Sequence, residues 1–312
     1  IDGRPIADSA MGEAADAQAP VTEARRGMFG WSNELALHVL ELKSIDPTVP
    51  MELLAARFQY EIREMNAALR ENGATLMPSG MHPWMDPRTE TRLWPHANAE
   101  VYRTYDRIFD CRTHGYANLQ SMHVNLPFAD DREFACLHDA IRLVLPILPA
   151  LAASSPYAEG RPAGALDYRM CVYRSNAAAV PEITGAVVPE RCDGRREYHD
   201  VILAPMYRAI ANHDGAATLK QEWLNARGAI ARFGRNAIEI RILHTQECPQ
   251  MEVALAALLV DLLQAICEGR IGTGSAALRT PLLAEVLAQC IVSADAAGIA
   301  QPNNLAGLDF PR

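Results

Sequence analysis

The sequence predicts an α+β fold, and three observations lead to this class. Stretches with apolar residues at every third or fourth position indicate helices, and they are separated by short segments with apolar residues at every second position, which indicate strands. The strands lie far apart in the chain without a regular strand–helix–strand rhythm, which disfavours a doubly wound parallel sheet. The 312 residues are 49% apolar and 21% charged, as in globular proteins. We therefore expect a single domain over residues 1–312.

The first elements follow from local patterns. Residues 1–30 have little periodicity, and we expect a short helix and loops there. The Leu-rich segment 35–42 predicts a strand. Segment 50–72 predicts an amphipathic helix, because it begins with Pro, is followed by Gly73 and has regularly spaced apolar residues. The later elements are a short strand at 74–77, a helix at 100–110, a strand at 119–128, a helix at 134–148 that Pro146 and Pro149 kink or break, a helix at 198–210, a strand at 237–243 and an apolar helix at 252–267.

Composition excludes several classes of protein. The formal charge of −9 argues against a nucleic-acid partner, because phosphate contacts need a basic surface. The seven cysteines are scattered without a Cys-x-x-Cys pair, which argues against a zinc finger or a disulfide framework and favours a reducing cytoplasm. No run of about 18 apolar residues appears, so we expect no membrane partner; the most apolar stretch, 255–266, contains Asp261 and predicts a buried helix.

Polar side chains lie on one face of the two most regular strands. In segment 119–128, Ser121, His123 and Asn125 alternate with apolar residues, and in segment 237–243, Glu239 and Arg241 alternate with isoleucines. If both strands belong to one sheet, its apolar face packs on helices and its other face presents these side chains to a cavity.

Glu41 interrupts the apolar segment 35–42 in a similar way. Together with His123 and Glu239 it forms a set of two carboxylates and one imidazole, which suits Mg²⁺ or Mn²⁺. The same set could hold Zn²⁺, so a metal-dependent amide hydrolase stays an alternative. Four arginines lie close together in the sequence near Gly228 and Gly234, which favours a polyphosphate substrate over a neutral amide; they are Arg227, Arg232, Arg235 and Arg241.

Several segments resemble the glutamate–cysteine ligase type 2 family of bacterial carboxylate–amine ligases, whose fold is similar to that of glutamine synthetase. The resemblance runs from about residue 33 to residue 250. The matching segments, in order, are Val-Leu-Glu-Leu at 39–42, Gly-Met-His-Pro at 80–83, Gln-Ser-Met-His-Val-Asn-Leu at 120–126, Leu-Pro-Ala-Leu-Ala-Ala-Ser-Ser-Pro at 148–156 and Ala-Ile-Glu-Ile-Arg at 237–241.

This resemblance implies a curved, mainly antiparallel sheet with helices packed on one face, as in the catalytic domain of glutamine synthetase. It implies ATP and Mg²⁺ as cofactors, with Glu41, His123 and Glu239 as metal ligands. The implied reaction joins a carboxylate to an amine through an acyl phosphate, and both substrates are small molecules. The arginines implied in phosphate binding are Arg241, Arg232 and Arg227, and the implied substrate-binding residues are His82, Asn125, Arg169 and Arg174.

The sequence departs from the family pattern in two places. The family begins with a strand that carries two alternating glutamates, whereas this chain begins at Ile1 with a segment that resembles the stretch just after that strand. We expect the strand to belong to the protein and to precede Ile1; if it is truly absent, a non-catalytic ligand-binding relative becomes the better interpretation. His244 stands where relatives often have Asp. The sequence leaves the donor carboxylate, the acceptor amine and the oligomeric state open, and a homo-oligomer is compatible with it.

Overall fold

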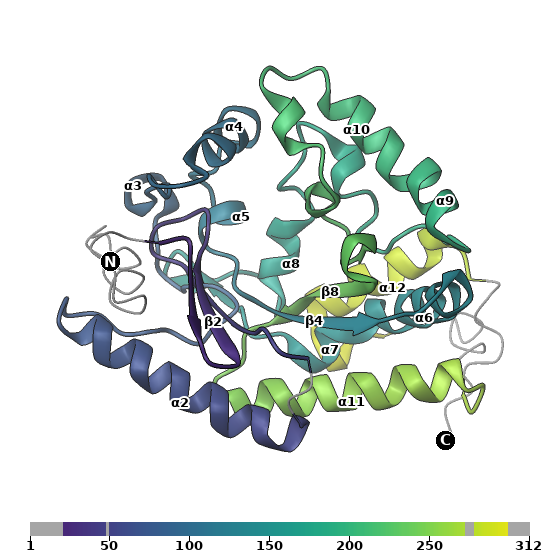
Figure 1. Cartoon of the computed structure of the whole chain (residues 1–312), viewed down its shortest axis with the longest axis horizontal. Coiled ribbons are helices and arrows are strands. Elements are labelled where there is room, and N and C mark those ends of the chain that lie inside the picture. Colours follow the sequence, from purple (N-terminus) through teal and green to yellow (C-terminus); the bar gives the residue numbers. More distant parts are fainter. Residues whose placement is uncertain (1–20, 48–49, 272–277, 299–312) are drawn as a thin grey trace.

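Two small antiparallel sheets carry the residues that the sequence singled out. The computed structural model describes residues 21–47, 50–271 and 278–298. In this part of the chain, one three-stranded sheet has the order β1-β2-β3 and the other has the order β4-β8-β7, with helices packed around them (Figure 1). This arrangement confirms a mixed fold of helices and antiparallel strands. The strand that carries Glu41 is in the first sheet, whereas the strands predicted at 119–128 and 237–243 are in the second.

The strands and helices have these bounds. The strands are β1 Glu23–Arg26, β2 Phe29–Asn33, β3 Leu40–Ser44, β4 Ser121–Pro127, β5 Tyr157–Ala158, β6 Arg161–Pro162, β7 Ala229–Arg232 and β8 Ala237–His244. The α-helices are α2 Met51–Arg70, α3 Pro87–Glu90, α4 Ala99–Phe109, α5 His114–Ala117, α6 Asp131–Val144, α7 Leu148–Ala152, α8 Tyr168–Tyr173, α9 Arg195–Tyr198, α10 Ala204–Ile210, α11 Pro249–Cys267 and α12 Thr280–Ser293. A π-helix, His199–Leu203, joins α9 to α10, and a 3₁₀-helix, Leu145–Ile147, joins α6 to α7.

The first sheet begins with a tight hairpin where the sequence predicted helix and loops. β1 and β2 pair from Glu23↔Ser32 to Arg26↔Phe29, so Gly27 and Met28 alone make the turn, and Gly27 supplies a φ of +63°. The remainder of that expectation, on residues 1–20, lies outside the described residues. The strand expected at 35–42 begins only at Leu40, because Leu37 N donates to Arg92 O and Val39 N turns back to Ala36 O.

The second sheet confirms the strands predicted at 119–128 and 237–243. β8 is central and pairs antiparallel with β4 and β7. The predicted apolar face exists, because Ile238, Ile240 and Ile242 of β8 are buried in the main core together with residues of α6 and α7. The β4–β8 register shifts between Met122 and Val124, so Arg241 and Ile242 of β8 together lie opposite His123 and form a β-bulge in β8; bulges of this kind re-aim a side chain.

Most of the predicted helices are present, and one predicted strand is absent. The helix expected at 134–148 is divided at Pro146 and Pro149 into α6, the 3₁₀-turn and α7, as the prolines predicted. Residues 74–77 form no strand, because Leu76 N and the Thr75 hydroxyl bond to the Asn66 side chain instead. The strand β7 and the helix α12 were not among the predicted elements.

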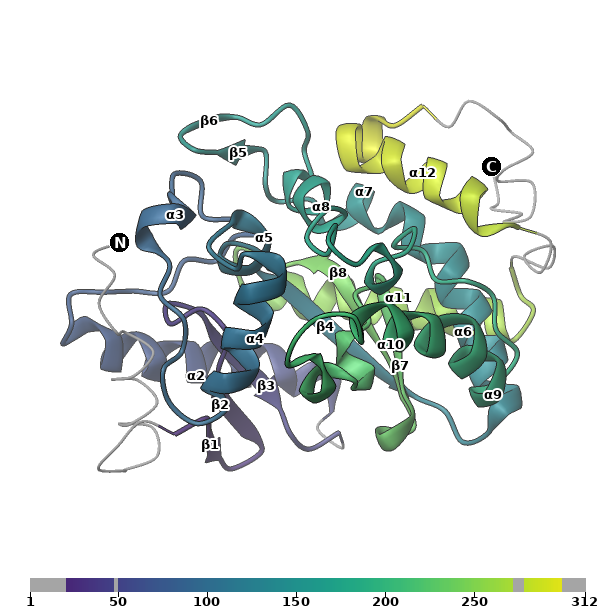
Figure 2. The same ribbon diagram turned by 90° about the horizontal axis from the view of Figure 1, so that it is seen from above.

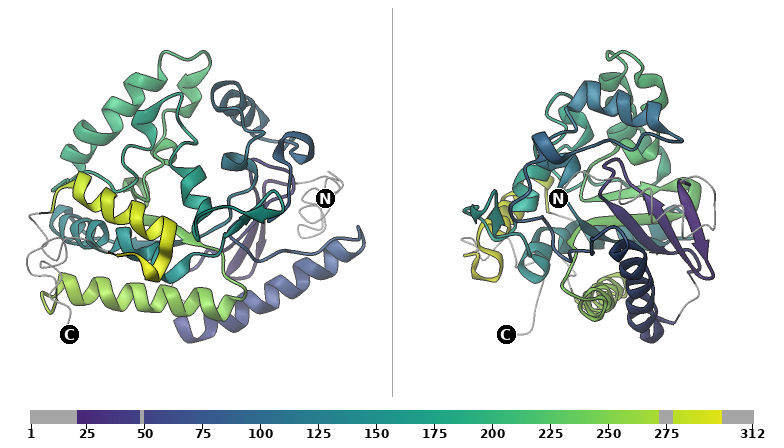
Figure 3. Two further views of the ribbon diagram at one scale, coloured as in Figure 1. Left: turned by 180° about the vertical axis from the view of Figure 1, so that it is seen from behind. Right: turned by 90° about the vertical axis from the view of Figure 1, so that its left-hand side faces the viewer.

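The apolar helix α11 is present but it is not the buried helix that its composition predicted. Only 17% of it is buried, and it lies with α2 along one side of the molecule (Figures 1 and 3). By length and composition alone, α11 and the stretch Asp131–Ala152 are both long and apolar enough to cross a membrane, contrary to the sequence expectation. The second stretch is 61% buried and belongs to the core, and core helices of soluble proteins pass the same test.

Candidate functional site

The candidate site is built on the polar face that β4 and β8 share. Asn125 and Glu239 stand directly opposite each other in the antiparallel register, so their side chains project from the same face of the sheet. His123, two residues before Asn125 on β4, projects from the same face: its Nδ1 lies 3.6 Å from Glu239 Oε1, and its Nε2 forms a 2.9 Å hydrogen bond with the Ser121 hydroxyl. The alternation seen in the sequence therefore gathers His123, Asn125 and Glu239.

Two arginines hold the carboxylate of Glu239. Arg232 Nη1 donates to Oε2 at 2.8 Å, and Arg241 Nε lies 3.4 Å from Oε1. All three side chains are largely enclosed, with exposed fractions of 16% for Arg232, 20% for Arg241 and 8% for Glu239. Two guanidiniums against one carboxylate leave a net positive charge in this enclosed place, which favours the binding of an anion such as a carboxylate or a phosphate.

Desolvation and nearby positive charges together keep His123 neutral. Desolvation by the surrounding protein lowers the pKa of His123 to about 3, and the charges of Arg241 and Arg169 act in the same direction. Glu41 acts in the opposite direction and raises the pKa, so its carboxylate lies near enough to influence the imidazole. A neutral imidazole has a free lone pair and is able to bind a metal ion or to accept a hydrogen bond.

The β1-β2-β3 sheet contributes two carboxyl groups. Glu41 accepts hydrogen bonds from the Ser32 hydroxyl at 2.6 Å and from Lys43 Nζ at 3.1 Å. Burial raises the pKa of Glu41, but these two partners outweigh burial and keep the pKa below its usual value. Glu34, just after β2, behaves differently: desolvation and the charge of Glu41 raise its pKa to about 7, although Arg241 counteracts them. The first sheet lies beside the second, with β3 near β4 (Figure 2), so the charges of the two sheets act on each other.

The predicted metal ligands are of the chemical types that bind Mg²⁺, but their side chains are not arranged as a metal site. Carboxylate oxygens and a neutral imidazole suit Mg²⁺ or Mn²⁺. Within the described residues, however, no three His, Cys, Asp or Glu side chains are close enough together to hold a metal ion. Glu239 is held by two arginines, and Glu41 by Ser32 and Lys43. Glu41, His123 and Glu239 therefore do not form a complete metal site by themselves.

Two of the predicted arginines are used inside the protein. Arg227 is 4% exposed, and its guanidinium binds both carboxylate oxygens of Glu190 and also bonds to Asn225 Oδ1 at 3.1 Å. Arg169 is 1% exposed and donates to the backbone carbonyls of Arg241 at 3.0 Å and Ile242 at 2.9 Å. Arg169 thus lies behind β8, where it holds the carbonyls of the two bulge residues, and its charge acts on the site.

The other two predicted substrate residues lie apart from Glu239. His82 packs edge-on against Trp84, and its backbone N–H bonds to Asn118 Oδ1 at 2.7 Å. Burial lowers the pKa of His82. Arg174 follows α8, is exposed and makes no ion pair with any residue that the structure describes. Substrate contacts of these two residues remain predictions.

His244, the position that departs from the family pattern, is a packing residue. It is fully buried, and its Nε2 lies 2.9 Å from Asp167 Oδ1 and 3.0 Å from the Ser155 hydroxyl. Its ring occupies the space beside Gly80, where an added Cβ atom would collide with His244 Cδ2. Two of the segments that resemble the family, those with Gly80 and Ser155, therefore meet around this one imidazole at the end of β8.

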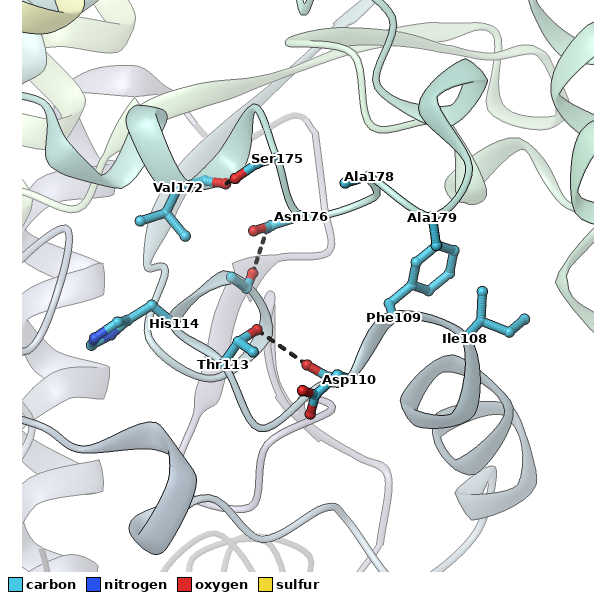
Figure 4. Close-up of a pocket in the computed structure, with 11 residues that line it drawn as sticks. Ile108, Phe109, Asp110, Thr113, His114, Val172, Ser175, Asn176, Ala178 and Ala179 are labelled. Atoms are coloured by element: carbon cyan, nitrogen blue, oxygen red, sulfur yellow. Dashed lines mark hydrogen bonds between the residues drawn. The ribbon is translucent and has the colours of Figure 1, made fainter.

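A separate cavity of about 470 Å³ lies between the end of α4, α5 and the C-terminal end of α8 (Figure 4). Its polar walls already bond to the protein: the Thr113 hydroxyl donates to Asp110 O, the Ser175 hydroxyl to Val172 O, and Asn176 Nδ2 to Gly115 O. Since these groups are occupied, the cavity presents few free groups for a substrate, and the enclosed charges at Glu239 make the stronger candidate site.

Sequence reasoning missed two residues that shape the site. Glu34 was not considered because β2, which it follows, was not predicted. Asn225 is fully buried in a 3₁₀-turn region; its carbonyl oxygen accepts from Arg241 Nη1 at 2.9 Å and its side chain bonds to Arg227 and to the Tyr198 hydroxyl. Asn225 thereby orients Arg241, and no feature of the sequence indicated this contact.

Comparison with known proteins agrees with the geometry. The model of glutamate–cysteine ligase family 2 matches residues 2–279. A protein of Archaeoglobus fulgidus with the name "Uncharacterized protein" is 36% identical over 248 residues, which are 80% of this chain and 66% of that protein. The "Putative glutamate--cysteine ligase 2-1" of a Nocardioides species is 29% identical over 170 residues, which are 54% of this chain and 39% of the relative.

A "Putative glutamate--cysteine ligase 2" of a Bradyrhizobium species is 28% identical over 145 residues, which are 46% of this chain and 32% of the relative. The matches thus cover about a third to two thirds of the relatives' own lengths. The family model, in contrast, matches nearly the whole chain and includes both sheets and the Glu239 site. The chain therefore belongs to glutamate–cysteine ligase family 2.

Proposed function

We propose that this protein is an ATP-dependent carboxylate–amine ligase that forms an amide bond, of the γ-glutamyl type, through an acyl-phosphate intermediate. The observation that carries the proposal is the enclosed group of Arg232, Arg241 and Glu239 on a chain of this family. The names of the related proteins, which mention glutamate–cysteine ligase, support the same class of reaction. A glutamine-synthetase-like fold and a cytoplasmic location are part of this proposal.

In the first step, a carboxylate oxygen of the donor attacks the γ-phosphorus of ATP. The bond from this phosphorus to the β,γ-bridging oxygen breaks, and ADP leaves with the electron pair. In the second step, the amine nitrogen attacks the acyl carbon, loses a proton, and inorganic phosphate leaves. Arg232 and Arg241 would neutralise the charge on the transferred phosphoryl group, and their fixed positions would supply most of the catalysis.

The other residues would position the reactants. The carboxylate of Glu239 holds both arginines in place, and Asn125, directly opposite on β4, would donate a hydrogen bond to the donor substrate. We further propose that Mg²⁺ or Mn²⁺ is required and that Glu41, His123 and Glu239 are among its ligands; such a cation would reduce the repulsion between ATP and the donor carboxylate.

The proposal is tested by measuring ADP and phosphate release with panels of carboxylates and amines. Release should require ATP, Mg²⁺ and an acceptor amine, and Glu239→Gln should abolish it. Glu247→Gln is the matched control, because Glu247 is exposed just after β8 and should keep full activity.

Full turnover by Glu239→Gln would show that the site is wrongly assigned. Amide hydrolysis that needs a metal ion but no nucleotide would identify a hydrolase instead. Binding of ATP or an amino acid without any turnover in the presence of all reactants would identify a non-catalytic relative.

A further inference from the structure

We propose that the face formed by α2 and α11 is the interface of a symmetric homodimer. The first observation is the exposure of α11. Within its 19 residues, only Glu252 and Asp261 are charged, yet only 17% of the helix is buried. Met251 and Leu258, seven residues apart and therefore on the same side of the helix, are 44% and 49% exposed. Exposed apolar patches rimmed by polar residues mark interaction sites.

The neighbouring helix α2 extends the same face. Leu53 and Tyr60, again seven residues apart, are 52% and 54% exposed. A groove of about 690 Å³ lies between α2 and the start of α11, with Ala56, Tyr60 and Gln250 among its walls. The two helices contact each other near the start of α11 and extend in opposite directions along the edge of the molecule (Figure 3). The face thus combines apolar anchors with a groove that could receive them.

The charges on α2 indicate that the occupant is a second copy of this chain. Glu52 and Arg63 both line the groove, and eleven residues are close to three full helical turns, so both lie on one side of α2. Neither forms an ion pair with another residue that the structure describes. A two-fold axis across the middle of α2 would place two copies of this helix antiparallel. Each Glu52 would then meet the partner subunit's Arg63, so the surface complements itself, as a two-fold interface must.

The face predicts specific behaviour of the full chain in sedimentation-velocity experiments. The wild type should be a dimer at micromolar concentration. Leu258→Glu and Tyr60→Glu should give folded monomers, because a charge then replaces an apolar anchor at an exposed position. Val292→Glu is the matched control: Val292 is 51% exposed on α12, outside this face, and this variant should remain a dimer.

Charge reversal tests the symmetric pairing directly. Glu52→Arg or Arg63→Glu alone places like charges together twice per dimer and should raise the dimer Kd about tenfold or more. The double variant Glu52→Arg/Arg63→Glu restores opposite charges and should return the Kd to within about threefold of the wild type. Circular dichroism of each variant confirms that it is folded.

Three results would overturn the proposal. A wild type that stays monomeric at every concentration, with amide protons of α11 protected from exchange, would show that another part of the chain covers the face. A monomer that sediments with phosphatidylcholine–phosphatidylglycerol vesicles would show that the face binds membranes. A dimer that is unaffected by Leu258→Glu and by the single charge reversals would show that another surface forms the interface.

Discussion

Replacing Arg169 tests whether this residue binds substrate or holds β8 in position. The sequence predicts that it binds substrate, whereas the structure places it behind β8, 1% exposed, with hydrogen bonds to the carbonyl oxygens of Arg241 and Ile242 at 3.0 and 2.9 Å. The perturbation is Arg169→Met, which keeps an unbranched side chain of similar reach but removes the donors and the charge.

The expected loss of stability depends on the buried groups that lose a hydrogen-bond or charge partner. Each buried carbonyl left without a hydrogen bond costs about 1–3 kcal/mol, so two carbonyls cost about 2–6 kcal/mol. Removing the guanidinium relieves part of its own desolvation, because its Nε atom has no hydrogen-bond partner. The buried carboxylate of Asp167, whose charge acts on Arg169, also loses a compensating charge. We expect a net loss of about 3 kcal/mol in the free energy of unfolding.

The assay is urea unfolding followed by circular dichroism, with Arg174→Met as the control. Arg174 follows the same helix but is exposed, so its replacement should change the free energy of unfolding by less than about 0.5 kcal/mol. Under the proposed function, Arg169→Met should also lower kcat, because β8 carries Glu239 and Arg241. If Arg169→Met unfolds like the wild type and raises only the KM for a substrate, Arg169 contacts that substrate and the positioning role is refuted.

Three further predictions concern buried groups. His138 is fully buried without a hydrogen bond to either ring nitrogen, so His138→Leu should raise the free energy of unfolding at pH 7 by about 1–2 kcal/mol. Burial lowers the pKa of His138 from 6.5 to about 3. The folded state that holds this neutral imidazole is therefore fully stable above about pH 6.5 and loses stability as the pH falls toward 3. The variant should lose less stability on acidification than the wild type, and an unchanged dependence of stability on pH would contradict this. Gly80→Ala places a Cβ in the space of His244 Cδ2 and should cost at least about 1–3 kcal/mol in urea unfolding, whereas Gly234→Ala, with open space around it, should be nearly neutral; equal stability of the two variants would refute the packing argument. Arg227→Lys breaks the two-oxygen pairing with Glu190 and should lower the free energy of unfolding by about 2–4 kcal/mol without changing the KM for ATP; a higher KM for ATP at unchanged stability would instead support the predicted γ-phosphate contact.

The sequence alone determined the elements whose signals are local. The alternation of polar and apolar residues predicted β4 and β8. It also placed His123, Asn125, Glu239 and Arg241 on one face, because alternation is a property of the extended backbone itself. Proline positions determined where the helix after β4 breaks, since proline lacks the N–H that a helix interior needs. Ordered short segments were enough to indicate the family that the comparison then confirmed.

Only the tertiary structure decided which of these residues meet. Glu41 belongs to a different sheet from Glu239, because β3 pairs with β2, with Glu41 opposite Ser32, and not with β4 or β8. Arg227 and Arg232 are five residues apart, yet one pairs with Glu190 and the other with Glu239. No local signal separates two such arginines, since the choice depends on carboxylates 37 and 7 residues away. The composition of α11 likewise predicted a buried helix, but burial depends on the elements that pack against a helix, and most residues of α11 are half-buried or exposed in the described fold.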